Sequence, residues 1–386
     1  MKYTPRPYQV EAIEKGIEFF TAKKVKGNAL QVIGTGLGKS IIIAEMAKEL
    51  PGRTLLFAPS KELIEQNVEK FTSYGYNCGV YSASVGRKDI DKVTFATIGS
   101  VVNRPELFKE FDRIIIDEAH HGMNPKQGNY KKFFDAIGNK RTCGLTATPY
   151  RLSNDGFGGA MLKFLTRTRP RIFNHVIYYV NNKPMFDAGY LAPLKYFSVG
   201  GFDRSQLKLN TTGTDYTDLS VHTYLQASGF KNKAVKAVKR LLEIGRKNVL
   251  VFTRFIEESE YIANQIEGAA VVTGETPKKE REQILADFKS GKINVVCNVG
   301  VLTTGFDYPE LETIVIFRPT LSLALFYQMI GRCIRPHPNK EHGMVVDLCG
   351  NLELFGKVED LWLSEDGGKW NISSNGKQLT NVYFNR

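Results

Sequence analysis

The sequence lacks the features that mark membrane-spanning, exported and zinc-binding proteins. No apolar run approaches the ~18 residues of a membrane-spanning helix. The N-terminal stretch MKYTPRPYQ contains no apolar segment of the kind found in signal peptides. The five cysteines are scattered, and none forms a C-x-x-C pair. They are typical of thiols in a reducing compartment rather than of a disulfide framework or a zinc site.

Positive charge is abundant and unevenly distributed. The 386 residues carry a net charge of +12, and residues 151–250 hold 16 Lys and Arg against 6 Asp and Glu, whereas residues 251–386 have a net charge of −4. A basic middle region favours a polyanionic partner. The helix expected from Lys231 to Arg240, taken alone, is better explained as a solvated basic face. The length of the chain predicts two or three domains.

The motif that organises the sequence is a glycine-rich loop, GTGLGKS, between a short apolar run and an Ile-rich helix. Its glycines allow the backbone to curl and to turn N–H groups inward, and the helix N-terminus behind them favours an anion. The lysine and the serine that end the loop can reach nucleotide phosphates and Mg²⁺. Ile33 stands where the strict phosphate-loop pattern has a glycine, so the motif is incomplete on that side. We predict that ATP is bound by Gly34, Thr35, Gly36, Leu37, Gly38, Lys39 and Ser40.

Apolar runs and helical segments alternate after this loop, which predicts a parallel sheet with right-handed crossovers. In such sheets, ligands lie at the carboxyl ends of the strands. The run RIIID ends in the sequence DEAH, so Asp117 is expected to hold Mg²⁺, and Glu118 to orient or deprotonate the attacking water. A second buried run ends in TATP. The hydroxyls of Thr146 and Thr148 can form hydrogen bonds that connect the nucleotide site to another part of the protein. His120 could link the DEAH segment to these hydroxyls.

The motif PRPYQ precedes an amphipathic helix near the start of the chain. The amide of Gln9 can pair bidentately with adenine, and the guanidinium of Arg6 can stack on the base. The alternative interpretation is that both residues simply begin the helix.

The β-α pattern resumes at Lys231 without a second phosphate loop. A second α/β domain of this kind would close over the nucleotide held by the first and supply arginines to it. The segment SLALFYQMIGRCIRP predicts a helix on which Gln328, Arg332 and Arg335 share one face. Both guanidinium groups can form charge-assisted bonds to a γ-phosphate. A helix end stabilised by salt bridges is the alternative.

The order of PRPYQ, GTGLGKS, DEAH and TATP resembles that of superfamily 2 helicases of the DEAD/DEAH-box type. The stretch NVGVLTTGFDYPELETIVIFRPTLSLALFYQMIGRCIRP, followed by VVDLCGN, is similar to RadD-like DNA repair helicases and, more distantly, to UvsW-like phage branch-migration helicases. The resemblance runs from residue 5 to about residue 351. It implies that Gly305 and Asp307 lie near the ribose. It also implies that nucleic acid is contacted by Pro59, Ser60, Lys61, Thr97, Thr253, Arg254, Thr303 and Thr304.

The sequence departs from both relatives at its ends. It has neither the Cys-rich C-terminal extension of RadD-like proteins nor the N-terminal DNA-binding domain of UvsW-like proteins, so we expect a minimal motor. Substrate choice would then come from residues 151–230 or from the tail. The tail, Phe355 to Arg386, predicts one or two β-hairpins, whose aromatic residues either pack against the second domain or stack on bases.

Together these patterns predict an α/β protein of two tandem RecA-like domains with parallel sheets flanked by helices. The expected boundaries are residues 1–185 and 186–355, with ATP in the cleft between the domains and a tail at 356–386. We expect an ATP-dependent DNA helicase or translocase that uses Mg²⁺ and acts on single-stranded or branched DNA in repair, recombination or replication. It would be a cytoplasmic monomer of a bacterial or phage-infected cell. The alternatives are an RNA-remodelling helicase, a DNA-stimulated ATPase subunit and a nucleotide-dependent clamp that does not unwind.

Overall fold

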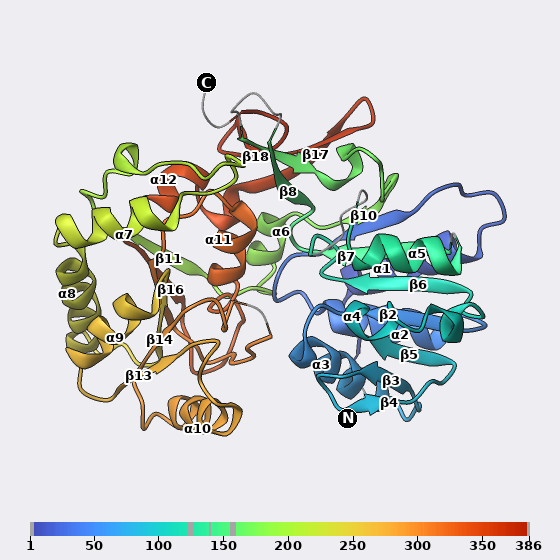
Figure 1. Cartoon of the computed structure of the whole chain (residues 1–386), viewed down its shortest axis with the longest axis horizontal. Helices are drawn as coiled ribbons and strands as arrows, with labels where there is room; N and C mark the ends of the chain where they lie inside the picture. The colour runs from blue at the N-terminus through green and yellow to red at the C-terminus, as the bar shows by residue number, and fades with distance from the viewer. Residues whose placement is uncertain (1–3, 122–126, 139, 155–159, 304, 384–386) are drawn as a thin grey trace. The chain divides into compact units, whose positions relative to one another are not determined.

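The chain forms two compact units (Figure 1), seen in a computed structural model that describes residues 4–121, 127–138, 140–154, 160–303 and 305–383. Unit 1 comprises Met1–Arg151, Lys163–Asn181 and Leu363–Asn371. Unit 2 comprises Leu152–Leu162, Asn182–Trp362 and Ile372–Arg386. Each unit is therefore assembled from segments that are distant in the sequence.

Unit 1 is built around a mostly parallel sheet. Among the described residues the sheet has eight strands in the order β10-β1-β7-β6-β2-β5-β3-β4, and β4 pairs antiparallel with β3. The strands are β1 (Ala29–Val32), β2 (Thr54–Phe57), β3 (Gly79–Ser82), β4 (Arg87–Lys88), β5 (Val93–Ala96), β6 (Arg113–Asp117), β7 (Arg141–Thr146) and β10 (His175–Tyr179). The flanking helices are α1 (Pro7–Thr21), α2 (Lys39–Glu49), α3 (Lys61–Thr72), α4 (Ile98–Val101) and α5 (Asn129–Ile137), with 3-10 turns at Pro105–Phe108 and Leu165–Arg167.

The central strands of this sheet are buried along their whole length. In β6, Ile114, Ile115 and Ile116 have no exposed surface, although consecutive residues point to opposite faces of a strand. A continuous apolar run is what a parallel strand covered on both faces requires. The polar residue that ends the run, Asp117, therefore lies where the strand leaves the core.

Unit 2 repeats the plan with a wholly parallel sheet. Its described strands have the order β11-β16-β15-β12-β14-β13. They are β11 (Leu194–Ser198), β12 (Val249–Thr253), β13 (Ala269–Val272), β14 (Val295–Asn298), β15 (Thr313–Phe317) and β16 (Gly343–Asp347). The helices are α6 (Asn182–Asp187), α7 (Asp218–Ala227), α8 (Phe230–Glu243), α9 (Ile256–Asn264), α10 (Lys278–Lys289), α11 (Leu323–Ile330) and α12 (Asn351–Phe355), with 3-10 turns at Arg204–Gln206 and Val358–Asp360. The predicted α/β class with parallel sheets is confirmed.

Helix α11 is shorter than predicted. It ends at Ile330 rather than running on to the arginines. Beyond it the Arg332 N–H bonds to the Met329 carbonyl at 3.2 Å, and the Cys333 N–H bonds to the Ile330 carbonyl at 3.0 Å. These i to i−3 bonds tighten the chain into turns, as is common where a helix ends. The helical-face argument for Arg335 was therefore wrong, and its position has to be taken from the structure.

Two small sheets complete the fold. Strands β8 (Tyr150–Asn154) and β9 (Ala160–Phe164) form one of them, and the tail strands β17 (Leu361–Asp366), β18 (Lys369–Ser374) and β19 (Lys377–Gln378) form the other. Trp370 packs against Phe164 and Tyr179, with ring centroids 6.4 Å and 5.2 Å apart. Trp362 is 47% exposed. Phe384, the last of the predicted tail aromatics, lies outside the described residues.

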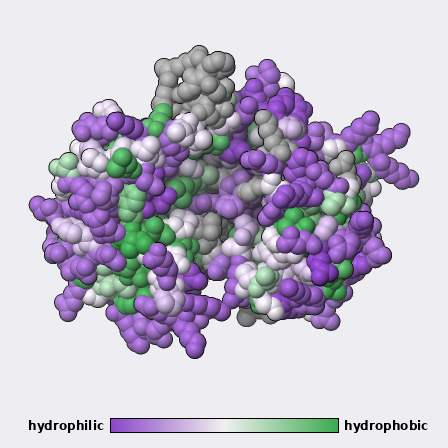
Figure 2. Space-filling model, in the orientation of Figure 1, coloured by the Kyte–Doolittle hydropathy of each residue, from purple (hydrophilic) through white to green (hydrophobic). Residues whose placement is uncertain are grey.

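The surface and the helices agree with the composition. On the face shown in Figure 2, hydrophilic residues predominate and hydrophobic ones form smaller groups between them. Within the described part of the chain, no helix has both the length and the apolar character needed to cross a bilayer. Four of the five cysteines are buried, and all five are thiols without a disulfide.

Candidate functional site

The glycine-rich loop connects β1 to α2 and depends on glycine at its end. Gly36 and Gly38 have φ angles of 81° and 75°, in the left-handed region that residues with a Cβ rarely adopt. A Cβ on Gly38 would lie 2.5 Å from Gln9 Nε2, so a side chain there would force one of the two groups to shift. The loop therefore owes its shape both to backbone torsion and to a neighbour from another helix. Lys39 follows as the first residue of α2.

The start of α1 fastens this loop. Gln9 Nε2 and Tyr8 Oη both donate to the carbonyl of Leu37, at 2.9 Å and 3.0 Å. The other end of the amide, Gln9 Oε1, accepts the Arg6 N–H at 2.8 Å, and Gln9 is only 3% exposed. Gln9 thus joins the PRPYQ motif to the phosphate loop. The adenine contacts of Gln9 and Arg6 stay predictions, and the part played by Tyr8 was missed by sequence reasoning.

The DEAH carboxylates face the phosphate loop within unit 1. Glu118 Oε1 lies 3.1 Å from Lys39 Nζ, and both side chains are largely buried. Glu118 has a φ of 48°, an uncommon angle for a residue with a side chain. Asp117 accepts from its neighbour's N–H at 2.9 Å and from Asn67 Nδ2, on α3, at 3.0 Å. Burial, with the neighbouring charge of Glu118 second, raises the pKa of Asp117 to about 6.

The DEAH and TATP segments meet through a histidine. His120 Nδ1 lies 2.8 Å from Thr146 Oγ1 and 3.4 Å from Glu118 Oε2. Burial lowers the pKa of His120 to about 4, so the ring is neutral near pH 7. Thr146 Oγ1 also accepts the Thr148 N–H at 3.0 Å, whereas Thr148 Oγ1 is buried without a hydrogen-bond partner among the described residues. A chain of polar contacts therefore runs from Lys39 through the DEAH residues to TATP.

The residues around the loop fit a nucleotide with Mg²⁺. Ser40 lies in the first turn of α2, and Asp117 ends the adjoining strand β6, so a hydroxyl and a carboxylate are available as the oxygen ligands that Mg²⁺ prefers. Within the described ranges, no group of three or more His, Cys, Asp or Glu side chains could hold a metal without other ligands. A magnesium ion that keeps most of its waters and shares the nucleotide's phosphates matches this donor set.

The predicted arginines of unit 2 lie beside Asp307. Arg335 forms an ion pair with Asp307. Arg332 donates to the carbonyl of Phe306 at 2.8 Å and to that of Gln328 at 3.3 Å. The two arginines predicted as catalytic thus lie close to Asp307, which was predicted near the ribose, within unit 2. Gly305, with a φ of 73°, lies in the same segment.

A buried lysine that sequence reasoning missed ties these segments together. Lys340 is 6% exposed, and its Nζ donates to the carbonyls of Pro309 at 2.6 Å, Leu311 at 3.2 Å and Cys333 at 3.2 Å. Cys333 lies between the two arginines, and Pro309 follows Asp307. Lys340 therefore holds the arginine segment to the aspartate segment. No motif signals this role, because the lysine lies in an unremarkable loop.

The nucleic-acid contacts predicted in unit 1 fall at the carboxyl ends of two strands. Pro59 follows β2 and Thr97 follows β5, and both line a surface hollow of about 850 Å³ together with Lys88 and Arg104. Thr97 Oγ1 is hydrogen-bonded to Ser100 Oγ at 2.9 Å.

Ser60 and Lys61, which follow Pro59 and were also predicted to contact nucleic acid, stabilise the start of helix α3. Ser60 is its N-cap and accepts the Leu63 N–H at 3.3 Å, while Lys61 pairs with Glu65 at 3.3 Å. Contacts of any of these residues with nucleic acid stay predictions.

The corresponding residues of unit 2 are engaged within the unit. Arg254 donates to Asp218 Oδ1 at 2.8 Å, to Asp215 Oδ2 at 3.4 Å and to the Tyr216 carbonyl at 2.7 Å, so the fold itself uses its guanidinium group. Thr253 is buried and hydrogen-bonds Ser259 Oγ at 2.7 Å.

The last two predicted contacts follow β14. Thr303 is also buried and donates to the Gly300 carbonyl at 3.2 Å. Thr304 lies outside the described residues. Binding of nucleic acid by the unit 2 residues stays a prediction.

Comparison with known proteins agrees with the fold of the two units. Residues 2–151 match the family model of the Type III restriction enzyme, res subunit, and residues 233–337 match that of the helicase conserved C-terminal domain. The ATP-dependent Type ISP restriction-modification enzyme LlaBIII, solved bound to DNA, has a similar fold over 90% of this chain and 28% of its own, with a TM-score of 0.65 and 16% identity.

Curated relatives match most of this chain but extend beyond it. A 51.5 kDa protein of a Lactococcus phage is 31% identical, covering 83% of this chain and 65% of its own. The DNA 3'-5' translocase XPB2 of Sulfurisphaera tokodaii is 26% identical, covering 86% of this chain and 78% of its own. The first three curated relatives are matched over 65%, 51% and 57% of their own lengths.

A phosphate loop with DEAH in one α/β unit, followed by a second such unit without the loop, defines the tandem RecA-like class of helicase domains. Within that class, the chain belongs to the superfamily 2 helicases. The narrower likeness to RadD-like proteins stays a prediction.

Proposed function

We propose that the chain is an ATP-dependent DNA translocase or helicase that remodels single-stranded or branched DNA in repair, recombination or replication. The observation that carries this proposal is the contact between Lys39 and Glu118, 3.1 Å apart, with His120 and Thr146 beyond them. This arrangement places a lysine that can bind phosphate next to a candidate general base. It also connects that base, through His120 and Thr146, to the TATP segment. The relative named as a DNA 3'-5' translocase supports DNA as the track and a 3'-to-5' direction.

Each residue of the unit 1 site has a role in this proposal. Lys39 and the loop N–H groups hold the phosphates, while Ser40 and Asp117 hold Mg²⁺, which supplies charge neutralisation on the phosphates. Glu118 orients the attacking water and accepts its proton, which requires that Lys39 first release the carboxylate. His120 is neutral at pH 7 and contacts both Glu118 and Thr146, so it couples a movement of Glu118 to the TATP segment.

Unit 2 would complete the chemistry. We propose that Arg332 and Arg335 stabilise the charge that develops on the γ-phosphate, an effect typically worth ~10³–10⁵ in kcat. Two observations support this role for the arginines. They belong to the motif QMIGRCIRP, and Lys340 fixes the segment between them by donating to the Cys333 carbonyl. Lys340 is then a positioning residue.

Translocation would follow from changes in DNA grip. The hollow lined by Pro59 and Thr97 carries Lys88 and Arg104, which suit phosphate contacts. Cycles of ATP binding and hydrolysis would alternate the grip of this surface with that of unit 2.

The test is ATP turnover measured with single-stranded DNA, duplex, forks, four-way junctions and single-stranded RNA, in parallel with strand displacement. We expect DNA to stimulate turnover and Lys39→Ala to abolish it. Stronger stimulation by RNA would favour an RNA-remodelling helicase. Stimulation by DNA without displacement of any strand would leave a translocase. Turnover that no nucleic acid changes would refute the proposal.

A further inference from the structure

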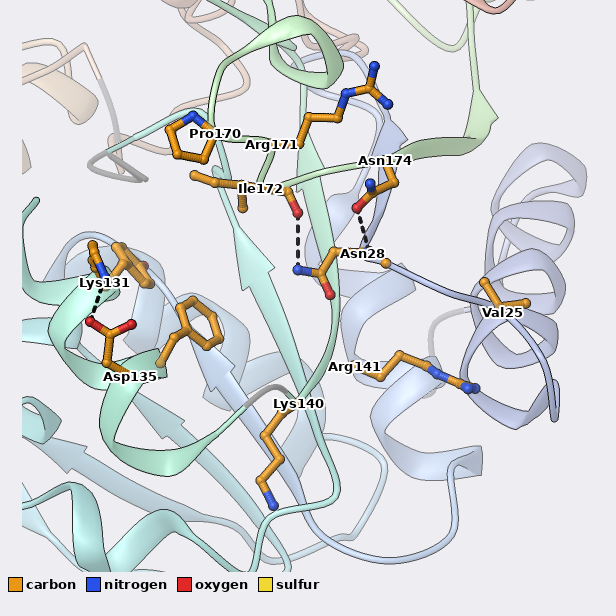
Figure 3. A pocket seen from close by; sticks show the side chains of 13 residues that line it. Val25, Asn28, Lys131, Asp135, Lys140, Arg141, Pro170, Arg171, Ile172 and Asn174 are labelled. Atoms are coloured by element: carbon orange, nitrogen blue, oxygen red, sulfur yellow. Dashed lines mark hydrogen bonds and ion pairs between the residues drawn. The ribbon is translucent and has the colours of Figure 1, made fainter. Parts of the chain in front are cut away.

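Unit 1 has a further cleft at the amino ends of its strands, on the side of the sheet away from the glycine-rich loop. It occupies about 640 Å³ and is lined by the loop at 25–28, helix α5, the start of β7 and the segment 170–174 (Figure 3). The phosphate loop follows the carboxyl end of β1, whereas this cleft adjoins the amino ends of β1 and β7. We call it the amino-edge cleft. None of the individual residues predicted to contact ATP or nucleic acid lines it, although its segment 170–174 belongs to the region 151–230 from which substrate choice was expected to come.

The floor of the amino-edge cleft is held by one asparagine. Asn28 Nδ2 donates to the Ile172 carbonyl at 3.0 Å, Asn28 Oδ1 accepts the Thr142 N–H at 3.2 Å, and the Asn28 N–H bonds to Asn174 Oδ1 at 3.1 Å. In Figure 3, Asn28 lies between the 170–174 segment and the start of β7. Three segments distant in the sequence are thereby fixed to one another, so the cleft is preformed.

The walls of the cleft are strongly basic. Among the described residues, Lys131, Lys140, Arg141 and Arg171 line it together with one carboxylate, Asp135, which is paired with Lys131 at 2.6 Å.

Two of these cations also serve the fold. Arg141 donates to backbone carbonyls at the end of α1, and Lys140 donates to the Lys109 carbonyl at 2.7 Å. Arg171 is exposed, and Lys131 is paired, within the part of the chain that the structure describes, only with the exposed carboxylate of Asp135, so these two cations are the best placed to meet a ligand.

A neighbouring hollow extends the positive surface. It occupies about 670 Å³, shares Val25 with the amino-edge cleft, and is lined by Lys15, Lys24, Lys26 and His175. Its carboxylate, Glu18, is paired with Lys15 at 2.9 Å. Lysines therefore line both of these neighbouring hollows, and an extended basic surface of this kind favours a polyanion over a single small anion.

The amino-edge cleft also offers a flat aromatic surface. Phe134 lines it half-buried and stacks on Tyr130, a second lining residue, with ring centroids 6.4 Å apart and planes inclined by 24°. Basic side chains beside a fixed aromatic ring are the combination that binds single-stranded nucleic acid, because the cations contact phosphates and the ring stacks on a base.

We propose that the amino-edge cleft binds a single strand of nucleic acid. Lys131 and Arg171 in the cleft and Lys26 in the neighbouring hollow would contact backbone phosphates, and Phe134 would stack on a base. This proposal rests on the proposed function for the nature of the polyanion, and it adds a site that the motor itself does not require. It lies at the opposite edge of the sheet from Pro59 and Thr97, so it would hold a strand segment separate from the one gripped there.

The test compares two variants with the same loss of charge. The cleft variant carries Lys26→Gln, Lys131→Gln and Arg171→Gln. The control variant carries Lys278→Gln, Lys279→Gln and Arg281→Gln on α10, where Lys278 pairs with Glu282 at 3.7 Å much as Lys131 pairs with Asp135. A fluorescent oligothymidylate is titrated at several salt concentrations, with anisotropy as the readout and turnover without DNA as the measure of an intact fold.

We expect the cleft variant to bind the oligonucleotide at least tenfold more weakly than the control variant. The slope of log affinity against log salt should fall by about 2, since each phosphate contact on a single strand contributes about 0.7. A separate variant, Phe134→Leu, should weaken binding several-fold without changing the salt slope, because it removes the ring and no charge.

Other results would overturn the proposal. Equal affinity of the cleft and control variants would do so. A loss seen only with duplex, or competition by polyglutamate as strong as by oligonucleotide, would assign the cleft to a different ligand. The two proposals can fail separately. If DNA stimulates turnover and the cleft variant behaves as the control, only the cleft proposal falls. If the cleft binds single strands but DNA never stimulates turnover, the proposed motor function falls instead.

Discussion

Replacing Glu118 by glutamine should tighten nucleotide binding while it abolishes hydrolysis. In the structure, Glu118 Oε1 lies 3.1 Å from Lys39 Nζ, so the carboxylate competes with phosphate for the lysine. Glutamine removes that competition and also removes a negative charge from the neighbourhood of the phosphates. It cannot accept a proton from water as a carboxylate does, so turnover should fall by at least ~10²-fold.

The size of the effect follows from the geometry of the pair. At 3.1 Å, two unit charges attract by about 5 kcal/mol at an effective dielectric constant of about 20. Desolvation of two largely buried groups offsets most of this attraction, which leaves roughly 1–2 kcal/mol as the net cost of separating them. Nucleotide affinity in Glu118→Gln should therefore rise by about five- to thirtyfold.

The assay is the dissociation constant of a fluorescent, non-hydrolysable ATP analogue with Mg²⁺. Glu110→Gln is the matched control, because it breaks a surface ion pair of unit 1, the one with Arg53 at 3.0 Å, which is remote from the phosphate loop. Its affinity should equal that of the wild type. If Glu118→Gln binds the analogue no more tightly than Glu110→Gln, then Glu118 does not hold Lys39 in solution and the reasoning is refuted.

Three further predictions concern stability. Gly38→Ala forces a Cβ to 2.5 Å from Gln9 Nε2 at a φ of 75°, so the free energy of unfolding measured in urea should fall by ~1–3 kcal/mol. The control is Gly99→Ala, which has open space around it and should lower the free energy of unfolding far less. Equal losses in the two variants would contradict the argument. Arg141→Gln removes a guanidinium that binds three carbonyls at the end of α1 and should cost ~1–3 kcal/mol by the same assay, an unchanged midpoint being the contrary result. Burial raises the pKa of Glu258 to about 7, so the folded state holds its proton between pH 4.5 and 7 while the unfolded state releases it, and the contribution of Glu258 to stability falls as pH rises through that window. Glu258→Gln should therefore gain ~1–3 kcal/mol over the wild type at pH 8 and nothing near pH 4.5, and a gain independent of pH would exclude this cause.

The fold class and the phosphate loop could be predicted from the sequence because their signals are local. Runs such as RIIID are apolar throughout, since a central parallel strand is buried on both faces. The glycines of the loop are needed where φ is positive, and Lys39 follows directly at the start of α2. Each of these features is set by residues adjacent in the chain, so spacing alone was enough to place them.

Contacts between residues that are far apart in the sequence could not be predicted from residue spacing. Asn67 on α3 reaches Asp117 only because β2 lies beside β6 in the sheet. Arg254 resembles a phosphate contact in its motif, yet unit 2 surrounds its guanidinium with Asp215 and Asp218. Lys340 gave no signal at all.

Residue types at fixed spacings encode strands, turns and anion sites, so the amino-acid sequence was enough to predict two α/β units, one phosphate loop, and the DEAH and TATP segments at strand ends. The ion pair between Lys39 and Glu118, the end of α11 at Ile330 and the basic cleft at the amino edge of unit 1 are seen only in the folded chain. These features depend on strand order and packing, which bring together groups whose separation along the chain carries no information about their distance in space.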